Sequence, residues 1–109
     1  MTTLEQSLSE IPAFSIIHKH LFSSAQPSIE QLKLIKEYGC STVINLALSN
    51  SPDSIKNEDQ VCLEYGLNYI HIPIDWETPS SDQCLLVLDL IDHLVQNEIV
   101  WIHCANSNA

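Results

Sequence analysis

Apolar positions follow two different patterns along the chain from residue 28 onward. Apolar residues recur at helical spacing in three segments and predict helices at about 28–38, 57–65 and 81–96. Nearly continuous apolar runs, rich in β-branched residues, predict buried strands at 41–48, 67–72 and 99–103. Helices and strands that alternate with short connections predict an α/β fold, with a parallel-containing central sheet flanked by helices.

Local signals mark the ends of these elements. Ser28 and Gln31 have the spacing of a capping box, which predicts the start of the first helix. Gly39 and Gly66 follow the first two helical patterns, where a residue with a left-handed backbone commonly ends a helix. The wide apolar face of the segment 81–96 predicts a helix packed on the core.

The part of the chain before residue 28 is less regular. Residues 1–13 show no strong period, so we expect a loosely ordered lead-in with at most a short helical turn. Apolar residues in 14–22 predict two short strands that meet at a tight turn. The length of 109 residues suits one small domain, so we expect a single α/β domain over 14–109.

The charge of the chain restricts its partners. Fourteen acidic residues and four basic ones give a formal net charge of -10, which repels nucleic acids and anionic membrane surfaces. No N-terminal basic and apolar leader is visible, and no apolar stretch approaches the roughly 18 residues of a membrane span. We therefore expect a cytoplasmic protein that binds neither nucleic acid nor membrane.

The four cysteines do not suggest a metal site or a disulfide framework. They lie far apart and form no Cys-x-x-Cys pair, so we expect free thiols and no metal or other cofactor. The spacing indicates that three of them are small apolar residues of helices and strands: Cys40, Cys62 and Cys84. Cys104 differs, because it directly follows the strand 99–103 and precedes small polar residues.

The position of Cys104 is typical of a reactive thiol. Ligands bind beyond the carboxyl ends of strands in open α/β sheets, and backbone N–H groups there can stabilise a thiolate or an oxyanion. This favours covalent phosphoryl or sulfuryl chemistry. Asp75, which follows the strand 67–72, is the candidate general acid for the leaving group. Three nearby acids are alternatives for that role: Asp53, Glu58 and Asp59.

Four segments carry a resemblance to a known family. They are His103-Cys104 after Val-Trp-Ile, Ile-Pro-Ile-Asp-Trp at 72–76, Ser-Ala-Gln-Pro-Ser-Ile-Glu-Gln-Leu at 24–32 leading to Gly39, and Thr-Val-Ile-Asn-Leu at 42–46. In this order they resemble the cysteine-dependent protein tyrosine and dual-specificity phosphatase superfamily. The similar branch is the bacterial domain that also occurs fused to β-lactamase-like hydrolases. The resemblance covers residues 14–108.

The resemblance implies a function and a set of site residues. It implies a thiolate nucleophile at Cys104, a general acid at Asp75, and a phosphorylated protein or small molecule as substrate. His103 would be a supporting residue that bonds the loop backbone. Backbone amides would bind the phosphate in the segment Ala105, Asn106, Ser107, Asn108 and Ala109.

The chain departs from the family pattern in one respect that bears on activity. The family carries an arginine five or six residues after the cysteine, and the fifth position here is Ala109. All four basic residues are lysines, so the 109 residues contain no arginine. We expect a chain that lacks the C-terminal helices of the family, is nearly inactive, and self-associates through an uncovered face of the sheet.

Two other classes of function stay open at this point. The first is a non-catalytic module that binds a phospho-group or a protein through the loop after Cys104. The second is a sulfur transferase in which Cys104 carries a persulfide.

Overall fold

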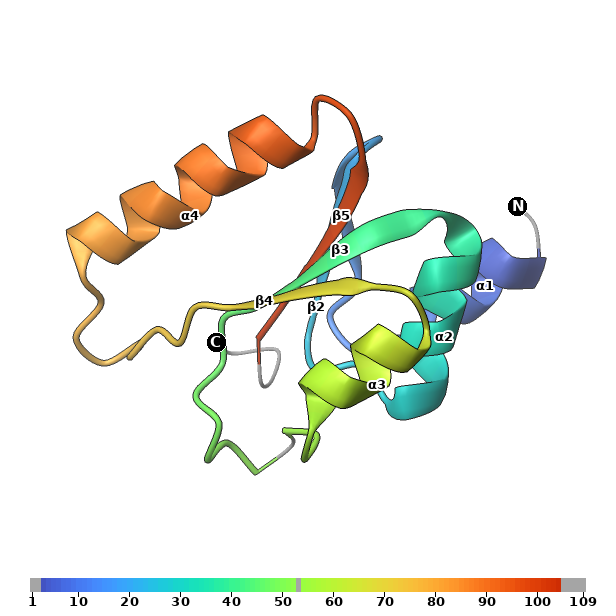
Figure 1. Cartoon of the computed structure of the whole chain (residues 1–109), viewed down its shortest axis with the longest axis horizontal. Helices are drawn as coiled ribbons and strands as arrows, with labels where there is room; N and C mark the ends of the chain where they lie inside the picture. Colours follow the sequence, from blue (N-terminus) through green and yellow to red (C-terminus); the bar gives the residue numbers. More distant parts are fainter. Residues whose placement is uncertain (1–2, 53, 105–109) are drawn as a thin grey trace.

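The computed structural model describes residues 3–52 and 54–104. It contains four helices in this part of the chain: α1 (Thr3–Ser9), α2 (Ile29–Tyr38), α3 (Glu58–Glu64) and α4 (Ser81–Leu94). It also contains five strands: β1 (Ser15–His18), β2 (Leu21–Ser24), β3 (Cys40–Asn45), β4 (Asn68–His71) and β5 (Ile99–His103). Each helix and strand expected from residue 14 onward is present, and the α/β fold is confirmed (Figure 1).

The five strands form one mixed sheet in the order β1-β2-β5-β3-β4. Strands β2, β5, β3 and β4 are parallel, and β1 pairs antiparallel with β2 at one edge. β5 is therefore the central strand, with β2 and β3 on its two sides. The carboxyl ends of the four parallel strands lie at one edge of the sheet, where α/β proteins bind ligands.

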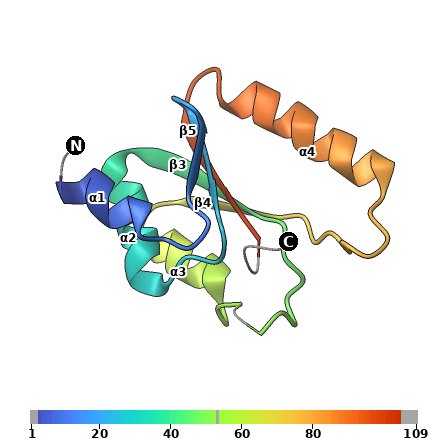
Figure 2. The same ribbon diagram turned by 180° about the vertical axis from the view of Figure 1, so that it is seen from behind.

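Side chains of the strands alternate between two apolar clusters. Helices α1, α2 and α3 cover one face, and α4 lies on the opposite side (Figures 1 and 2). In β5, Trp101 belongs to the cluster beneath α1, α2 and α3, while Val100 and Ile102 belong to the cluster beneath α4. This explains the continuous apolar run of β5, since a strand covered on both faces has no solvent-facing positions.

The ends of α2 have the expected capping groups. The Ser28 hydroxyl accepts a hydrogen bond from the Gln31 N–H, and the Gln31 side chain accepts one from the Ser28 N–H. Gly39 then ends the helix with a φ of 116°, a conformation that a Cβ atom would strain. The chain can therefore enter β3 directly after the helix.

The N-terminal segment packs more closely than the sequence pattern indicates. Leu8 of α1 and Ile11 after it are 2% and 1% exposed and belong to the cluster that contains Trp101. The Ala25 N–H also donates a hydrogen bond to the Pro12 carbonyl at 2.8 Å. Leu4, Leu8 and Ile11 have a helical spacing that is too short to be a strong signal, so only their burial against the sheet reveals their role.

Helix α4 contributes less to the core than its sequence indicates. Only Val87 and Ile91 are buried, whereas Leu85, Leu86 and Leu88 are 58%, 55% and 59% exposed. The expected helix packed on the core is present, but part of its wide apolar face is exposed. The reason is that α4 is apolar on several sides and only one side meets the sheet. Self-association through an uncovered sheet face stays a prediction.

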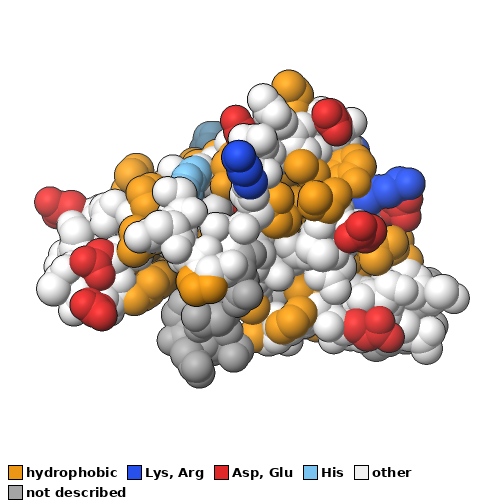
Figure 3. Space-filling model, turned by 90° about the horizontal axis from the view of Figure 1, so that it is seen from below, with side chains coloured by type: hydrophobic (Ala, Val, Ile, Leu, Met, Phe, Trp, Pro, Cys, Tyr) orange, Lys and Arg blue, Asp and Glu red, His pale blue; other side chains and the backbone are white. Residues whose placement is uncertain are grey.

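The surface agrees with the acidic composition. Acidic side chains predominate over basic ones on the face drawn in Figure 3, and exposed apolar groups lie between them. No helix within residues 3–52 and 54–104 is long and apolar enough to cross a membrane.

We predict that two core thiols make folding sensitive to alkaline pH. Burial raises the pKa of Cys40 and Cys62 to about 12, and the charges of Glu58 and Asp59 add to the rise at Cys62. Between about pH 8.5 and pH 12 the unfolded chain therefore binds fewer protons than the folded chain. The free energy of unfolding should fall by about 1 kcal/mol per thiol per pH unit in this window.

Urea denaturation at pH 7 and pH 10 measures this effect. A Cys40→Ala, Cys62→Ala variant provides the control, because its stability should depend less steeply on alkaline pH than that of the unmodified chain. If the free energy of unfolding decreased equally between pH 7 and pH 10 in the two proteins, the prediction would be contradicted.

Candidate active site

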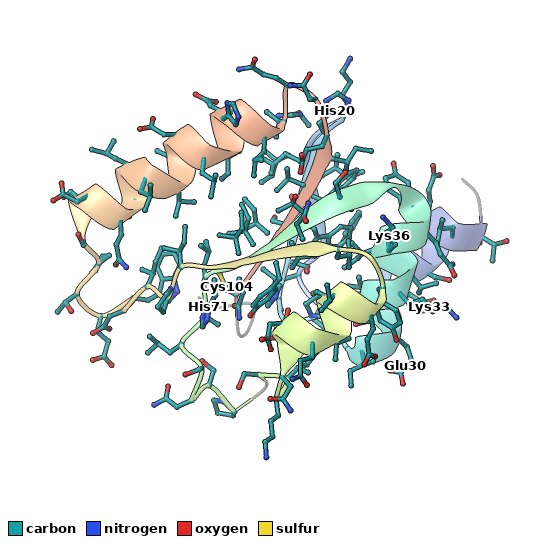
Figure 4. All side chains as sticks on the ribbon, in the orientation of Figure 1. His20, Glu30, Lys33, Lys36, His71 and Cys104 are labelled. Carbon is teal, nitrogen blue, oxygen red and sulfur yellow. The ribbon has the colours of Figure 1, made fainter. Side chains whose placement is uncertain are left out.

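Three residues form a row across the carboxyl edge of the sheet. Asn45 of β3 lies opposite His103 of β5 on one side and opposite His71 of β4 on the other. Cys104, which is labelled in Figure 4, directly follows His103 and the end of β5. Cys104 therefore lies at the carboxyl end of the central strand, as the sequence predicts.

Neighbouring strands hold the backbone at Cys104 in place. The Cys104 N–H donates to the Ser24 carbonyl at 3.2 Å, and the Leu46 N–H donates to the His103 carbonyl at 2.9 Å. The side chain is partly buried, and burial raises the pKa of its thiol, because a thiolate loses hydration there. A reactive thiolate at this position therefore needs a nearby group that favours the negative charge.

His103 is fully buried and hydrogen-bonded through both ring nitrogens. Its Nε2 atom lies 2.6 Å from Oε2 of Glu58, the first residue of α3, and its Nδ1 atom lies 3.2 Å from the Cys104 carbonyl oxygen. The Gln26 Nε2 atom donates to the other Glu58 oxygen at 3.3 Å. The Gln26 Oε1 atom is buried without a hydrogen-bond partner among the described residues. His103 thus joins the Cys104 backbone to α3.

Asp75 comes from the same edge of the sheet but from a different strand. It follows β4, which β3 separates from β5, so the two strands lie roughly 10 Å apart. Its carboxylate accepts hydrogen bonds from the Glu77 N–H at 3.0 Å and from the Thr78 hydroxyl at 3.1 Å. Asp75 is exposed, and both of its oxygens are bonded within its own loop.

The alternatives to Asp75 occupy different environments. Glu58 is buried against His103, and Asp59 is exposed at the start of α3. Asp53 lies outside the described residues, as do the expected phosphate-binding residues Ala105, Asn106, Ser107, Asn108 and Ala109. Within the part of the chain that the structure describes, no group of three or more His, Cys, Asp or Glu side chains suits a metal ion.

A polar pocket adjoins the Glu58–His103 pair. Its volume is about 350 Å³, and it lies between the ends of β3 and β4 and the start of α3. Asn45, Tyr69 and His71 line it together with Glu58 and Asp59. The Asn45 side chain donates to the Tyr69 hydroxyl at 2.8 Å, and His71 Nε2 lies 2.7 Å from the Ala47 carbonyl, so these side chains have fixed positions.

Comparison with protein families decides what kind of protein this is. The family model Tc-R-P, described as "Polymorphic toxin system, DSP-PTPase phosphatase", matches residues 19–108. The chain belongs to this family. The match includes β2 to β5 and the residue that follows β5, Cys104, so the resemblance to cysteine-dependent phosphatases is confirmed.

Solved structures of phosphatase-type proteins have the same fold. A DUF442 protein from Shewanella putrefaciens CN-32 is 28% identical, with a TM-score of 0.86, and the match covers 94% of this chain and 67% of that one. A protein from Neisseria meningitidis z2491 is 18% identical, with a TM-score of 0.72, and the coverage is 88% and 69%. No curated protein sequence matches the chain.

A third structure contains a ligand. P. aeruginosa TpbA, in a cysteine-to-serine variant in complex with pTyr, is 18% identical to this chain with a TM-score of 0.67. The match covers 84% of this chain and 52% of TpbA. At this identity the likeness shows a shared fold.

Sequence reasoning did not find the contact between Glu58 and His103. The two residues are 45 positions apart, and Glu58 begins a helix whose N-cap, Asn57, makes no side-chain capping bond. The only available signal was that Glu58 is an acid near the predicted start of that helix. Its burial against a histidine becomes visible only when α3 is docked on the sheet.

Proposed function

We propose that Cys104 is the nucleophile of a phosphate-ester hydrolase site that works slowly in this 109-residue chain. The observation that carries the proposal is the place of Cys104 at the carboxyl end of the central strand, within the segment that matches the phosphatase family. The hydrogen bonds from Cys104 to β2 and from Leu46 to His103 support it, because they give the nucleophile a fixed position.

The proposed reaction has two steps. The Cys104 sulfur attacks phosphorus and forms an S–P bond, while the P–O ester bond breaks and the leaving oxygen takes a proton from Asp75. Water then attacks phosphorus, transfers a proton to Asp75 and displaces the sulfur, which releases phosphate and restores the thiolate. Asp75 must exchange a hydrogen bond within its loop for one to the leaving oxygen.

The substrate class follows from the pocket and from the charge of the chain. The pocket between β3, β4 and α3, which borders Glu58, offers amide, phenol and imidazole groups to a substrate. Its exposed acid, Asp59, disfavours polyanionic substrates. A phosphorylated protein side chain or a small phosphomonoester suits these properties, and the pTyr complex of TpbA shows one such ligand on a similar fold.

Covalent trapping tests the role of Cys104. The chain is incubated with p-nitrophenyl phosphate, whose leaving group needs no proton, quenched with acid, and examined by intact mass and peptide mapping. We expect one phosphoryl group on Cys104, none in Cys104→Ser, and unchanged labelling in Cys84→Ser, where another partly exposed thiol is removed. Absence of label on Cys104 after prolonged incubation would refute the proposal.

A further inference from the structure

The carboxyl group of Glu58 is buried beside the residue that precedes Cys104. Glu58 is 4% exposed, and each of its two oxygens has a hydrogen-bond partner, His103 at one and Gln26 at the other. The proposed reaction steps above give this group no role. A buried acid needs compensating partners, and here the main partner belongs to the active-site strand.

Both ring nitrogens of His103 face oxygen atoms. Nε2 faces a Glu58 oxygen and Nδ1 faces the Cys104 carbonyl oxygen. An imidazole nitrogen bonds to a carbonyl or carboxylate oxygen by donating its own hydrogen. With Glu58 as a carboxylate, the ring donates both bonds and carries two protons, and the carboxylate balances the resulting positive charge within the core.

We propose that Glu58 is a positioning residue that holds His103 as an imidazolium against the Cys104 backbone and thereby favours the Cys104 thiolate. The inference deepens the proposed function and rests on Cys104 being the nucleophile. Burial opposes the thiolate, and a cation on the preceding residue supplies the compensation that the site requires. Glu58 acts on the thiol through His103 and does not itself contact the substrate phosphate.

Two neighbouring residues show the sign of the direct electrostatic effect of Glu58 on a titratable group. Its negative charge contributes, after burial, to the raised pKa of Cys62 and of Tyr69, both about 12, and Asp59 contributes in the same direction. A direct effect of Glu58 on Cys104 would likewise disfavour the thiolate. The indirect effect through His103 has the opposite sign, because it favours the thiolate. An experiment that shows whether removal of the Glu58 charge raises or lowers the reactivity of Cys104 therefore distinguishes the two effects.

Alkylation of Cys104 by iodoacetamide measures the thiolate without any phosphate chemistry. The rates are determined by peptide mass between pH 6 and pH 10 in a Cys84→Ser background, where Cys40 and Cys62 are buried. In Glu58→Gln we expect the rate near neutral pH to fall about tenfold, equivalent to one pKa unit. In Glu64→Gln, the matched control that removes an exposed carboxylate from the same helix, the rate should stay unchanged.

Two further measurements keep the inference testable if Glu58→Gln folds poorly. In a His103→Asn background, Glu58→Gln should have no additional effect, because the pathway through the imidazole is gone. Nitrogen-15 NMR of the unmodified chain should show both ring nitrogens of His103 protonated at neutral pH. A neutral His103 ring, or an alkylation rate in folded Glu58→Gln that is unchanged or higher, overturns the inference. Failure of phosphocysteine trapping with these results intact would refute only the hydrolase function.

Discussion

Replacement of Trp101 by alanine should lower the free energy of unfolding by about 3–5 kcal/mol. Trp101 is 0% exposed and lies on the central strand of the sheet. Its ring stacks on that of Phe22 with a centroid distance of 5.5 Å and lies tilted against that of Phe14 with a centroid distance of 5.6 Å. Its Nε1 atom also donates to the Ser24 hydroxyl at 2.8 Å. Since small domains have total stabilities of about 5–15 kcal/mol, this loss is a large fraction of the total.

The other tryptophan of the chain provides the matched control. Trp76 is 44% exposed, so Trp76→Ala should change stability by less than about 1 kcal/mol. Trp101→Phe should lie between the two variants, because it keeps a ring in the core and Ser24 still donates to the Ala25 carbonyl. Urea denaturation followed by circular dichroism gives all three values. A Trp101→Ala variant as stable as Trp76→Ala would mean that the packing of β5 is wrongly described.

Hydrolysis of p-nitrophenyl phosphate by the 109-residue chain should be at least about 10³-fold slower than by a phosphatase of the same fold that carries the arginine. Arginine binds phosphate through two parallel hydrogen bonds and stabilises charge that develops in the transition state. The four lysines of this chain cannot supply a planar, bidentate group. The activity due to the site is the difference between the unmodified chain and Cys104→Ser.

Free guanidinium tests whether the missing group limits the rate. Guanidinium chloride, added at concentrations far below those that unfold the protein, should raise the rate of the unmodified chain and leave Cys104→Ser unchanged. Sodium chloride at equal ionic strength is the control for screening. A rate within tenfold of the arginine-bearing enzyme, without guanidinium, would contradict the prediction.

The fold was largely predictable because its signals are local. The capping box at Ser28, the glycine after α2 and the continuous apolar run of β5 each involve neighbouring residues, and each predicts one element. The order of elements then limits the possible sheets, since βαβ connections are short and right-handed. Cys104 could be identified for the same reason: the end of a buried strand is visible in a few residues.

The misjudged elements depend on contacts between distant segments. Helix α4 has an apolar pattern on several sides, and the pattern alone does not reveal that Leu85 and Leu88 face away from the sheet. At Leu8, by contrast, a short and weak pattern belongs to a buried cluster that also contains Trp101. In both cases the extent of burial depends on the surface against which the element packs. The local spacing of apolar residues does not reveal that surface.

Local sequence determined the elements, their order and the place of the candidate nucleophile. Backbone hydrogen bonding and apolar periodicity act over a few residues, so these properties can be read along the chain. Tertiary structure decided the environment of that nucleophile. Glu58 and His103 are 45 positions apart, and docking of α3 on the sheet brings them to 2.6 Å. Burial and charge pairing depend on such long-range contacts, and they form the surroundings of Cys104.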